Sequence, residues 1–213
     1  DVAKRFMGGH AIVAGQLPLA AGLALAQQYQ KTDGLTMCFF GDGSTNQGIY
    51  HETMNLAAIW KLPILFFLEN NMYGMGSSIE RVRAGGIDFY PGMATYEIPA
   101  VEVDGMDVLA VREVTEVAIT RIRKGGGPQF IEAKTFRFGG HSLADGQKYR
   151  GQEDIIEYWV RHNKLEESSS SSLPDVDPDD DSRVRLMKYW SDDHDVKVLF
   201  YIVENGGHDW PGL

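Results

Sequence analysis

The sequence contains a single cysteine, Cys38, among 213 residues, and it has no apolar run of the ~18 residues that a membrane-spanning helix needs. One cysteine excludes a framework of intramolecular disulfides. Because Cys38 lies inside a short apolar stretch, we expect it to pack in the interior rather than to react. No secretory signal pattern is visible, and we expect no association with a membrane.

Basic residues are also scarce, with 20 Lys and Arg against 30 Asp and Glu and a net charge of -10. The imbalance is concentrated in one place. Residues 1–165 hold 16 basic and 18 acidic side chains and residues 183–213 hold 4 and 5, whereas residues 166–182 hold 7 acidic side chains and no basic one. The main part of the chain is therefore nearly neutral, and we expect no nucleic acid partner.

Short apolar runs alternate with segments of helical periodicity along most of the chain. The apolar runs predict strands at 35–40, 64–68, 100–103 and 129–136, and the periodic segments predict helices at 17–30, 49–61, 108–124 and 153–164. Strands that alternate with helices predict an α/β fold with a doubly wound parallel sheet.

The end of the chain differs in composition from what precedes it. Residues 166–182 are rich in Ser and Asp and predict a flexible acidic linker, because they offer little apolar surface to bury. We therefore expect one domain over residues 1–165, a linker over 166–182, and a separate tail over 183–213 that contains a strand at 196–203.

Two polar motifs directly follow two of the predicted strands. The sequence Gly-Asp-Gly at residues 41–43 follows the first, and Asn70-Asn71 follows the second. Both could be ordinary tight turns. However, parallel strands joined by a helix end at the same edge of the sheet, which brings Asp42 and Asn71 together. A carboxylate and an amide oxygen suit Mg²⁺, and the glycines let the backbone approach a diphosphate, so we favour a magnesium diphosphate site.

Residues 1 to about 158 resemble the α subunit of the thiamine diphosphate-dependent E1 component of 2-oxo acid dehydrogenase complexes, of the pyruvate or acetoin type. The segments that carry the resemblance are IVAGQLPLAAGLALA at 12–26, FGDGSTNQGIYHETMNLAAIWKLPILFFLENNMYGMG at 40–76, SSIER at 77–81, VDGMDV at 103–108, and GHS at 140–142 with Asp145 and Tyr149-Arg150. Family members also have an upstream segment with a Tyr-Arg pair for the diphosphate. No counterpart is present, so we expect an N-terminally incomplete domain.

The resemblance implies a role for particular residues. Asp42 and Asn71 would bind Mg²⁺ through their side chains, and Tyr73 through its backbone carbonyl. Val13 would lie against the aminopyrimidine ring of thiamine diphosphate, and His141 would contact the diphosphate and act as the catalytic proton donor. The further cofactor contacts implied are Gly41, Gly43, Ser44 and Gly74. The alternative for His141 is a loop histidine on a partner surface.

The resemblance also implies an activity and partners. The chain would decarboxylate pyruvate or a similar small 2-oxo acid together with an E1 β subunit, in an α2β2 assembly, and the product would pass to a lipoyl group on E2. It would work in the cytoplasm, or in the mitochondrial matrix of a eukaryote. Two alternatives remain, namely an acetoin dehydrogenase α subunit and an inactive fusion or fragment that binds only a partner or metal.

The tail resembles a different family. The sequence GGHDWPG at 206–212 resembles the histidine loop of polyhydroxybutyrate depolymerase-like and feruloyl esterase-like hydrolases, in which His208 would be the base of a Ser-His-Asp triad. The chain has no G-x-S-x-G nucleophile sequence. We therefore expect no ester hydrolysis, and we interpret residues 183–213 as an esterase-like fragment joined to the first domain.

Overall fold

The computed structural model describes residues 3, 5–142, 144–145, 151–175, 183–192 and 194–204. The chain divides into two compact units, residues 1–146 and residues 147–213, and each is described by itself. Among the described residues, no helix combines the length and the apolar character needed to cross a bilayer.

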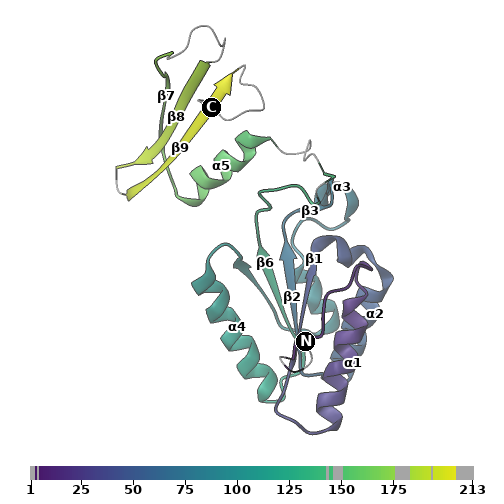
Figure 1. The fold of residues 1–213 in the computed structure, drawn as a ribbon. Helices are drawn as coiled ribbons and strands as arrows, with labels where there is room; N and C mark the ends of the chain where they lie inside the picture. The colour runs from purple at the N-terminus through teal and green to yellow at the C-terminus, as the bar shows by residue number, and fades with distance from the viewer. Residues whose placement is uncertain are drawn as a thin grey trace. The chain divides into compact units, whose positions relative to one another are not determined.

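The first unit is built on a four-stranded sheet of β1 (Thr36–Gly41), β2 (Ile64–Asn70), β5 (Ala100–Asp104) and β6 (Gln129–Lys134). The strands are all parallel and their spatial order is β1-β2-β6-β5. Helices α1 (Gln16–Tyr29) and α2 (Gly48–Ile59) cover one face, and α4 (Val108–Arg123) covers the other (Figure 1). The predicted doubly wound α/β fold is confirmed.

The side chains of β2 show how one strand serves both layers. Phe66 and Leu68 pack in the cluster that contains α1 and α2, whereas Leu65 and Phe67 pack in the cluster under α4. Alternate residues of a strand point to opposite faces, so a strand covered on both sides must be apolar throughout. This explains why the run at 64–68 shows no alternation, and Cys38 is buried in the first cluster as expected.

Short elements follow the carboxyl ends of the strands. The five-residue 3₁₀ helix η2 (Asp42–Asn46) follows β1, and the small hairpin of β3 (Tyr73–Gly74) and β4 (Ser77–Ser78) follows β2. Helix α3 (Ile79–Val82) and the 3₁₀ helix η3 (Tyr90–Tyr96) then lead to β5. The segment between β2 and β5 therefore contains several short elements.

Helix α4 begins at a side-chain cap. The Asp107 carboxylate accepts hydrogen bonds from the backbone N–H groups of Leu109 (2.9 Å) and Ala110 (3.1 Å), which would otherwise lack partners.

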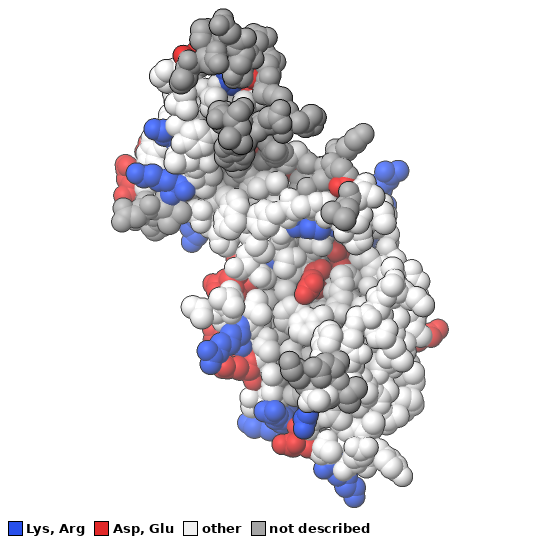
Figure 2. Space-filling model, viewed as in Figure 1, with Lys and Arg blue, Asp and Glu red and all other residues white. Residues whose placement is uncertain are grey.

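On the face shown in Figure 2, basic side chains are interspersed with acidic ones. Arg112 and Glu116 form an ion pair 2.8 Å apart on the exposed side of α4.

The second unit contains α5 (Gln152–His162) and an antiparallel sheet of β7 (Glu167–Ser172), β8 (Arg183–Ser191) and β9 (His194–Glu204), in the order β7-β8-β9. The strand predicted at 196–203 lies within β9. The predicted linker differs from the structure, because residues 167–172 pair with β8 as a strand whose six side chains are all exposed. Backbone hydrogen bonds hold this strand, and serine composition gives no sign of them.

The boundary between the units also differs from the expected one. The division falls after Gly146 rather than after Leu165, so α5 belongs with the antiparallel sheet. Its contacts within that unit include β9. Residues 205–213, which carry the tail's resemblance and His208, lie outside the described residues.

Candidate functional site

Asp42 stands where β1 ends and η2 begins. Strands β1 and β2 run parallel with Gly41 opposite Glu69, so the residues that follow each strand emerge at the same edge of the sheet. Asp42 is only 1% exposed. Its backbone carbonyl accepts a hydrogen bond from the Thr45 hydroxyl at 2.7 Å, which closes the turn of η2 around it.

The Asp42 carboxylate lies in an environment that does not satisfy its charge. Burial raises its pKa, and hydrogen bonds from the backbone amides of Asp42 and Asn71, with the nearby Arg137, act in the opposite direction. One carboxylate oxygen, Oδ2, is buried and has no hydrogen-bond partner. A buried anionic oxygen without a partner is costly unless a cation is bound beside it. This orphaned oxygen fits a hard cation such as Mg²⁺.

The Asn70-Asn71 turn is fixed by its own side chains. Asn70 Oδ1 accepts a hydrogen bond from the backbone N–H of Met72 at 3.0 Å, and Asn71 Oδ1 accepts one from that of Tyr73 at 3.1 Å. Met72 has a φ of 69°, a left-handed conformation that costs non-glycine residues roughly 1–2 kcal/mol. The turn therefore holds a strained backbone beside Asp42, and the Asn71 amide is among the groups that oppose the rise that burial causes in the pKa of the Asp42 carboxyl.

Two glycines bring the Asp42 loop against the β3 strand. A Cβ atom added to Gly43 would lie 3.4 Å from the Cα atom of Gly74, and a Cβ atom on Gly74 would lie equally close to Gly43. The two backbones are thus in direct contact. Arg137 reaches the same hairpin, where it donates to the carbonyl oxygen of Met75 at 2.6 Å and to that of Tyr73 at 3.5 Å.

The structure thus brings together five of the residues predicted from sequence. These are Asp42, Gly43, Asn71, Tyr73 and Gly74. Arg137 was not predicted, although an arginine directly after an apolar strand at this edge was visible in the sequence. The arrangement offers a carboxylate and an amide oxygen for a cation, and a guanidinium group close to the same carboxylate for an anionic ligand.

The other predicted residues lie around this group or apart from it. Gly41 is the last residue of β1, and Ser44 is buried within η2. Val13 is 55% exposed in the turn before α1, whose first residue Gln16 donates through Nε2 to the carbonyl oxygen of Phe39 at 3.3 Å. This contact places the start of α1 near the end of β1.

His141 is exposed, and its backbone N–H donates to the Asp145 carboxylate at 2.7 Å. Within the described part of the chain, this bond ties His141 to its own loop, and no described hydrogen bond or ion pair joins it to Asp42 or Asn71. Its contact with a diphosphate stays a prediction.

Three acidic side chains gather near the site, with Glu102 within β5, Glu132 within β6 and Asp88 in the segment before η3. Carboxylate oxygens of Asp88, Glu102 and Glu132 lie within 4.8 Å of one another, a spacing that could hold a metal ion. The Lys134 ammonium group already lies among them, 2.7 Å from Asp88, 2.8 Å from Glu132 and 3.6 Å from Glu102. Lysine therefore supplies the cation here, and we assign no metal to this cluster.

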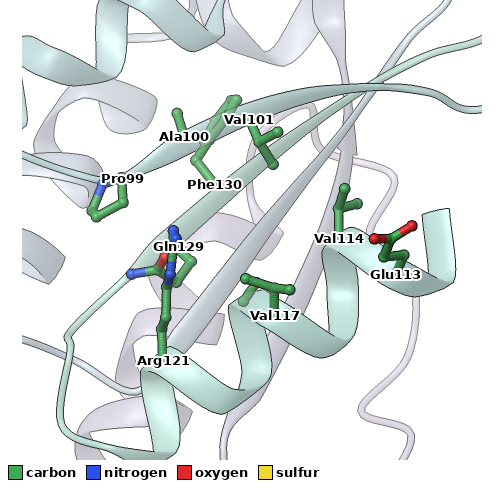
Figure 3. Close-up of a pocket in the computed structure, with 10 residues that line it drawn as sticks. Pro99, Ala100, Val101, Glu113, Val114, Val117, Arg121, Gln129 and Phe130 are labelled. Atoms are coloured by element: carbon green, nitrogen blue, oxygen red, sulfur yellow. The ribbon is translucent and has the colours of Figure 1, made fainter. Parts of the chain in front are cut away.

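A groove of about 180 Å³ lies between α4 and the edge strand β5. Val114 and Val117 of α4 face Val101 of β5 across it, and Glu113 and Arg121 lie toward its ends (Figure 3). The lining is mainly apolar and contains none of the residues around Asp42. The groove is thus distinct from the candidate site.

Residues 1–169 match the family described as dehydrogenase E1 component. A pyruvate dehydrogenase E1 component subunit alpha from Zymomonas mobilis is 46% identical over 162 residues, which are 76% of this chain and 46% of that protein. The alpha subunit of acetoin:2,6-dichlorophenolindophenol oxidoreductase from Bacillus subtilis is 40% identical over 185 residues, 83% of this chain and 55% of that protein.

An X-ray structure of an enzyme isolated from Mycobacterium smegmatis, assigned there as thiamin diphosphate-dependent, is 23% identical with a TM-score of 0.45. That similarity covers 59% of this chain and 22% of the other. The chain spans about half the length of the curated relatives it matches.

Proposed function

The chain belongs to the dehydrogenase E1 component family, and on this premise we propose that it anchors magnesium thiamine diphosphate in the α subunit of a 2-oxo acid dehydrogenase. The substrate would be pyruvate or a similar small 2-oxo acid, and the acyl product would pass to a lipoyl group on E2. The complex would work in the cytoplasm, or in the mitochondrial matrix of a eukaryotic cell.

The observation that carries this proposal is the buried carboxylate of Asp42. Its Oδ2 atom is buried and has no hydrogen-bond partner. A turn with only a structural role has no reason to bury an unsatisfied charge, whereas a cation site requires one. Asp42 and Asn71 would hold Mg²⁺ through side-chain oxygens, and Tyr73 would add its backbone carbonyl.

Bound thiamine diphosphate supplies an electron sink for the loss of carbon dioxide from a 2-oxo acid. The chain's own residues would position it. Gly43 and Gly74 let the two backbones come into contact, because a Cβ atom added to either would lie 3.4 Å from the Cα atom of the other, and the absence of side chains there would allow phosphate oxygens to approach beside η2. Burial raises the pKa of the Asp42 carboxyl and the nearby Arg137 guanidinium group opposes that rise, so Arg137 would also attract an anionic diphosphate. Gly41 and Ser44 lie on either side of Asp42 and Gly43 in the chain and would also contact the cofactor.

Two further residues complete the proposal. Val13, exposed in the turn before α1, would offer an apolar surface to the aminopyrimidine ring. His141 would contact the diphosphate and donate a proton near the reacting centre, because an imidazole changes charge near neutral pH.

A β subunit partner is supported by apolar side chains that the first unit leaves exposed. Leu19 and Tyr29 of α1 are 53% and 87% exposed, and Phe39 of the edge strand β1 is 50% exposed. Helix α1 carries no charged residue. Large exposed apolar groups on a charge-free helix are typical of a surface that another polypeptide covers. We propose an α2β2 assembly in which the β subunit supplies the rest of the cofactor site.

Two alternatives keep specific support. The Bacillus subtilis relative, an acetoin oxidoreductase subunit, is 40% identical over 185 residues, so acetoin is the second candidate substrate. The chain also spans about half of its relatives' length, which supports a fragment that binds metal or partner without activity. Both alternatives retain the Asp42 site, so substrate assays separate them from the main proposal.

Calorimetric titration with Mg²⁺ and thiamine diphosphate tests the anchor. The chain is titrated alone and then with a β subunit of the family, and Asp42→Ala is compared with wild type. Asp33→Ala is the matched control, because Asp33 is an exposed aspartate beyond the opposite end of β1.

We expect binding in the presence of the β subunit that is lost in Asp42→Ala and kept in Asp33→Ala. Absence of binding to the folded wild-type chain under both conditions would rule the proposal out. Cofactor binding without turnover of pyruvate or acetoin would instead identify the inactive fragment.

A further inference from the structure

Glu132 is a buried acid in the middle of the sheet. It lies on β6 between the apolar residues Ile131 and Ala133, and its exposure is 0%. A charged group at such a position is strongly unfavourable unless it is fully hydrogen-bonded. Its partners therefore indicate why the chain tolerates it.

Four donors converge on the Glu132 carboxylate. Oε1 accepts from Asn70 Nδ2 at 2.7 Å and from Lys134 Nζ at 2.8 Å. Oε2 accepts from the backbone N–H groups of Phe89 at 2.7 Å and Tyr90 at 2.8 Å. Both oxygens are thus satisfied. In contrast with Asp42, Glu132 has no oxygen left over for a ligand.

Asn70 connects this carboxylate to the candidate cation site. The Asn70 amide donates to Glu132 and to the carbonyl oxygen of Ile87 (3.1 Å) through the same nitrogen. This fixes which way its oxygen points, and that oxygen accepts from the Met72 amide. Met72 occupies the left-handed conformation between Asn71 and Tyr73, so Asn70 stabilises the strained turn that carries both proposed ligands.

We propose that Glu132 is a positioning residue for the cation site. It orients the Asn70 side chain, and Asn70 holds the Asn71–Tyr73 turn in the conformation that presents ligand oxygens next to Asp42. Glu132 touches neither cation nor cofactor. This inference rests on the proposed function for its ligand, whereas the orientation of the turn can be measured without any ligand.

The four donors explain why a carboxylate is needed. A glutamine at this position would have one oxygen and one NH₂ group, so two of the four donors would face another donor. Lys134 balances the charge of Glu132, and it also pairs with Asp88 and Glu102 on its more exposed side. The hydrogen bond to Asn70 therefore distinguishes Glu132 from the other two acids.

This difference provides a matched set of variants. Glu132→Gln alters the bond to Asn70, whereas Glu102→Gln removes one acid from Lys134 and leaves Asn70 untouched. Asn70→Ser breaks the same link from the other side and keeps a short acceptor for the Met72 amide. The three variants are compared with wild type in unfolding experiments and in titrations with Mg²⁺ and thiamine diphosphate in the presence of the β subunit. Hydrogen exchange is also measured at the backbone amides of Met72 and Tyr73.

We expect Glu132→Gln and Asn70→Ser to weaken Mg²⁺ binding by about tenfold, which is about 1.4 kcal/mol at 25 °C, and to speed exchange at both amides. Glu102→Gln should stay within about twofold of wild type. Folded Glu132→Gln and Asn70→Ser variants with wild-type affinity and exchange would overturn the inference, even if their stability were lower.

If the wild-type chain binds no Mg²⁺ or cofactor, the proposed function fails, and amide exchange decides the positioning role separately. Faster exchange at Met72 and Tyr73 in the two variants would then support it. Unchanged exchange at both amides would rule out the positioning role of Glu132.

Discussion

Asp42 should lower the stability of the metal-free chain, because its carboxylate is buried with one oxygen unpaired. Asp42→Asn removes the charge and keeps one side-chain oxygen that can accept hydrogen bonds. Leaving a buried polar group unsatisfied costs about 1–3 kcal/mol, with more for a charged one. The amide of the variant is also incompletely paired, so we expect a net gain of about 1 kcal/mol in the free energy of unfolding at neutral pH.

Bound ligand should make the wild type more stable than Asp42→Asn. A ligand at 100 times its Kd stabilises the folded state by about 2.7 kcal/mol, and only the wild-type carboxylate can hold Mg²⁺ tightly. With Mg²⁺ and thiamine diphosphate present, Asp42→Asn should therefore be less stable than wild type by about 2 kcal/mol. Urea unfolding in a chelator and in saturating ligand measures both differences, and Asp33→Asn is the control that should change neither.

The pH dependence follows from the raised pKa of Asp42. The folded state holds this proton more tightly than the unfolded state, whose pKa is about 3.9. The cost of the charge is absent below the unfolded pKa and grows as pH rises through the folded pKa. As pH rises from the unfolded pKa through the folded pKa, Asp42→Asn should become more stable than wild type in the absence of ligand. As pH decreases through the same range, the affinity of the wild type for Mg²⁺ should fall. A variant less stable than wild type in chelator at neutral pH would refute the reasoning.

Two other predictions follow from local packing. Gly105→Ala should lower the free energy of unfolding by about 1–3 kcal/mol, because a Cβ atom there would lie 2.6 Å from Thr135 Cγ2 and 2.8 Å from the Lys134 carbonyl oxygen. Gly92→Ala is its control in urea unfolding, since a Cβ atom at Gly92 meets nothing within 4 Å, and equal stability of the two variants would contradict the packing argument. Burial raises the pKa of the Cys38 thiol to about 12, so a thiol reagent at mildly alkaline pH should react far more slowly with the native chain than in guanidinium chloride. Similar rates in both would show that Cys38 is accessible.

The parallel sheet and the pairing of Asp42 with Asn71 could be predicted because their signals are local. An apolar run such as 64–68 predicts a buried strand from its own residues, and the connection through a helix determines that β1 and β2 end at one edge. The predicted segment 108–124 matches α4 closely for the same reason, since Asp107 caps it and glycines follow it. The strand at 167–172 was missed, because its serine side chains give no such local signal.

The partners of buried polar groups were decided by tertiary structure alone. Glu132 accepts from Asn70, 62 positions earlier, and from Phe89, 43 positions earlier. The sequence showed an acid within an apolar strand but no partner for it. The strand order β1-β2-β6-β5, which places Glu132 next to Asn70, is likewise absent from the pattern of residues.

The sequence by itself determined which residues form the parallel strands of the first unit and which polar residues follow them, because periodicity and short motifs are properties of neighbouring residues. Tertiary structure decided which of those oxygens are left unpaired. Asp42 Oδ2 lacks a partner, whereas the Glu132 carboxylate is saturated by four donors. The physical reason is that the cost of a buried charge depends on donors brought from distant parts of the chain, and only the fold brings them together.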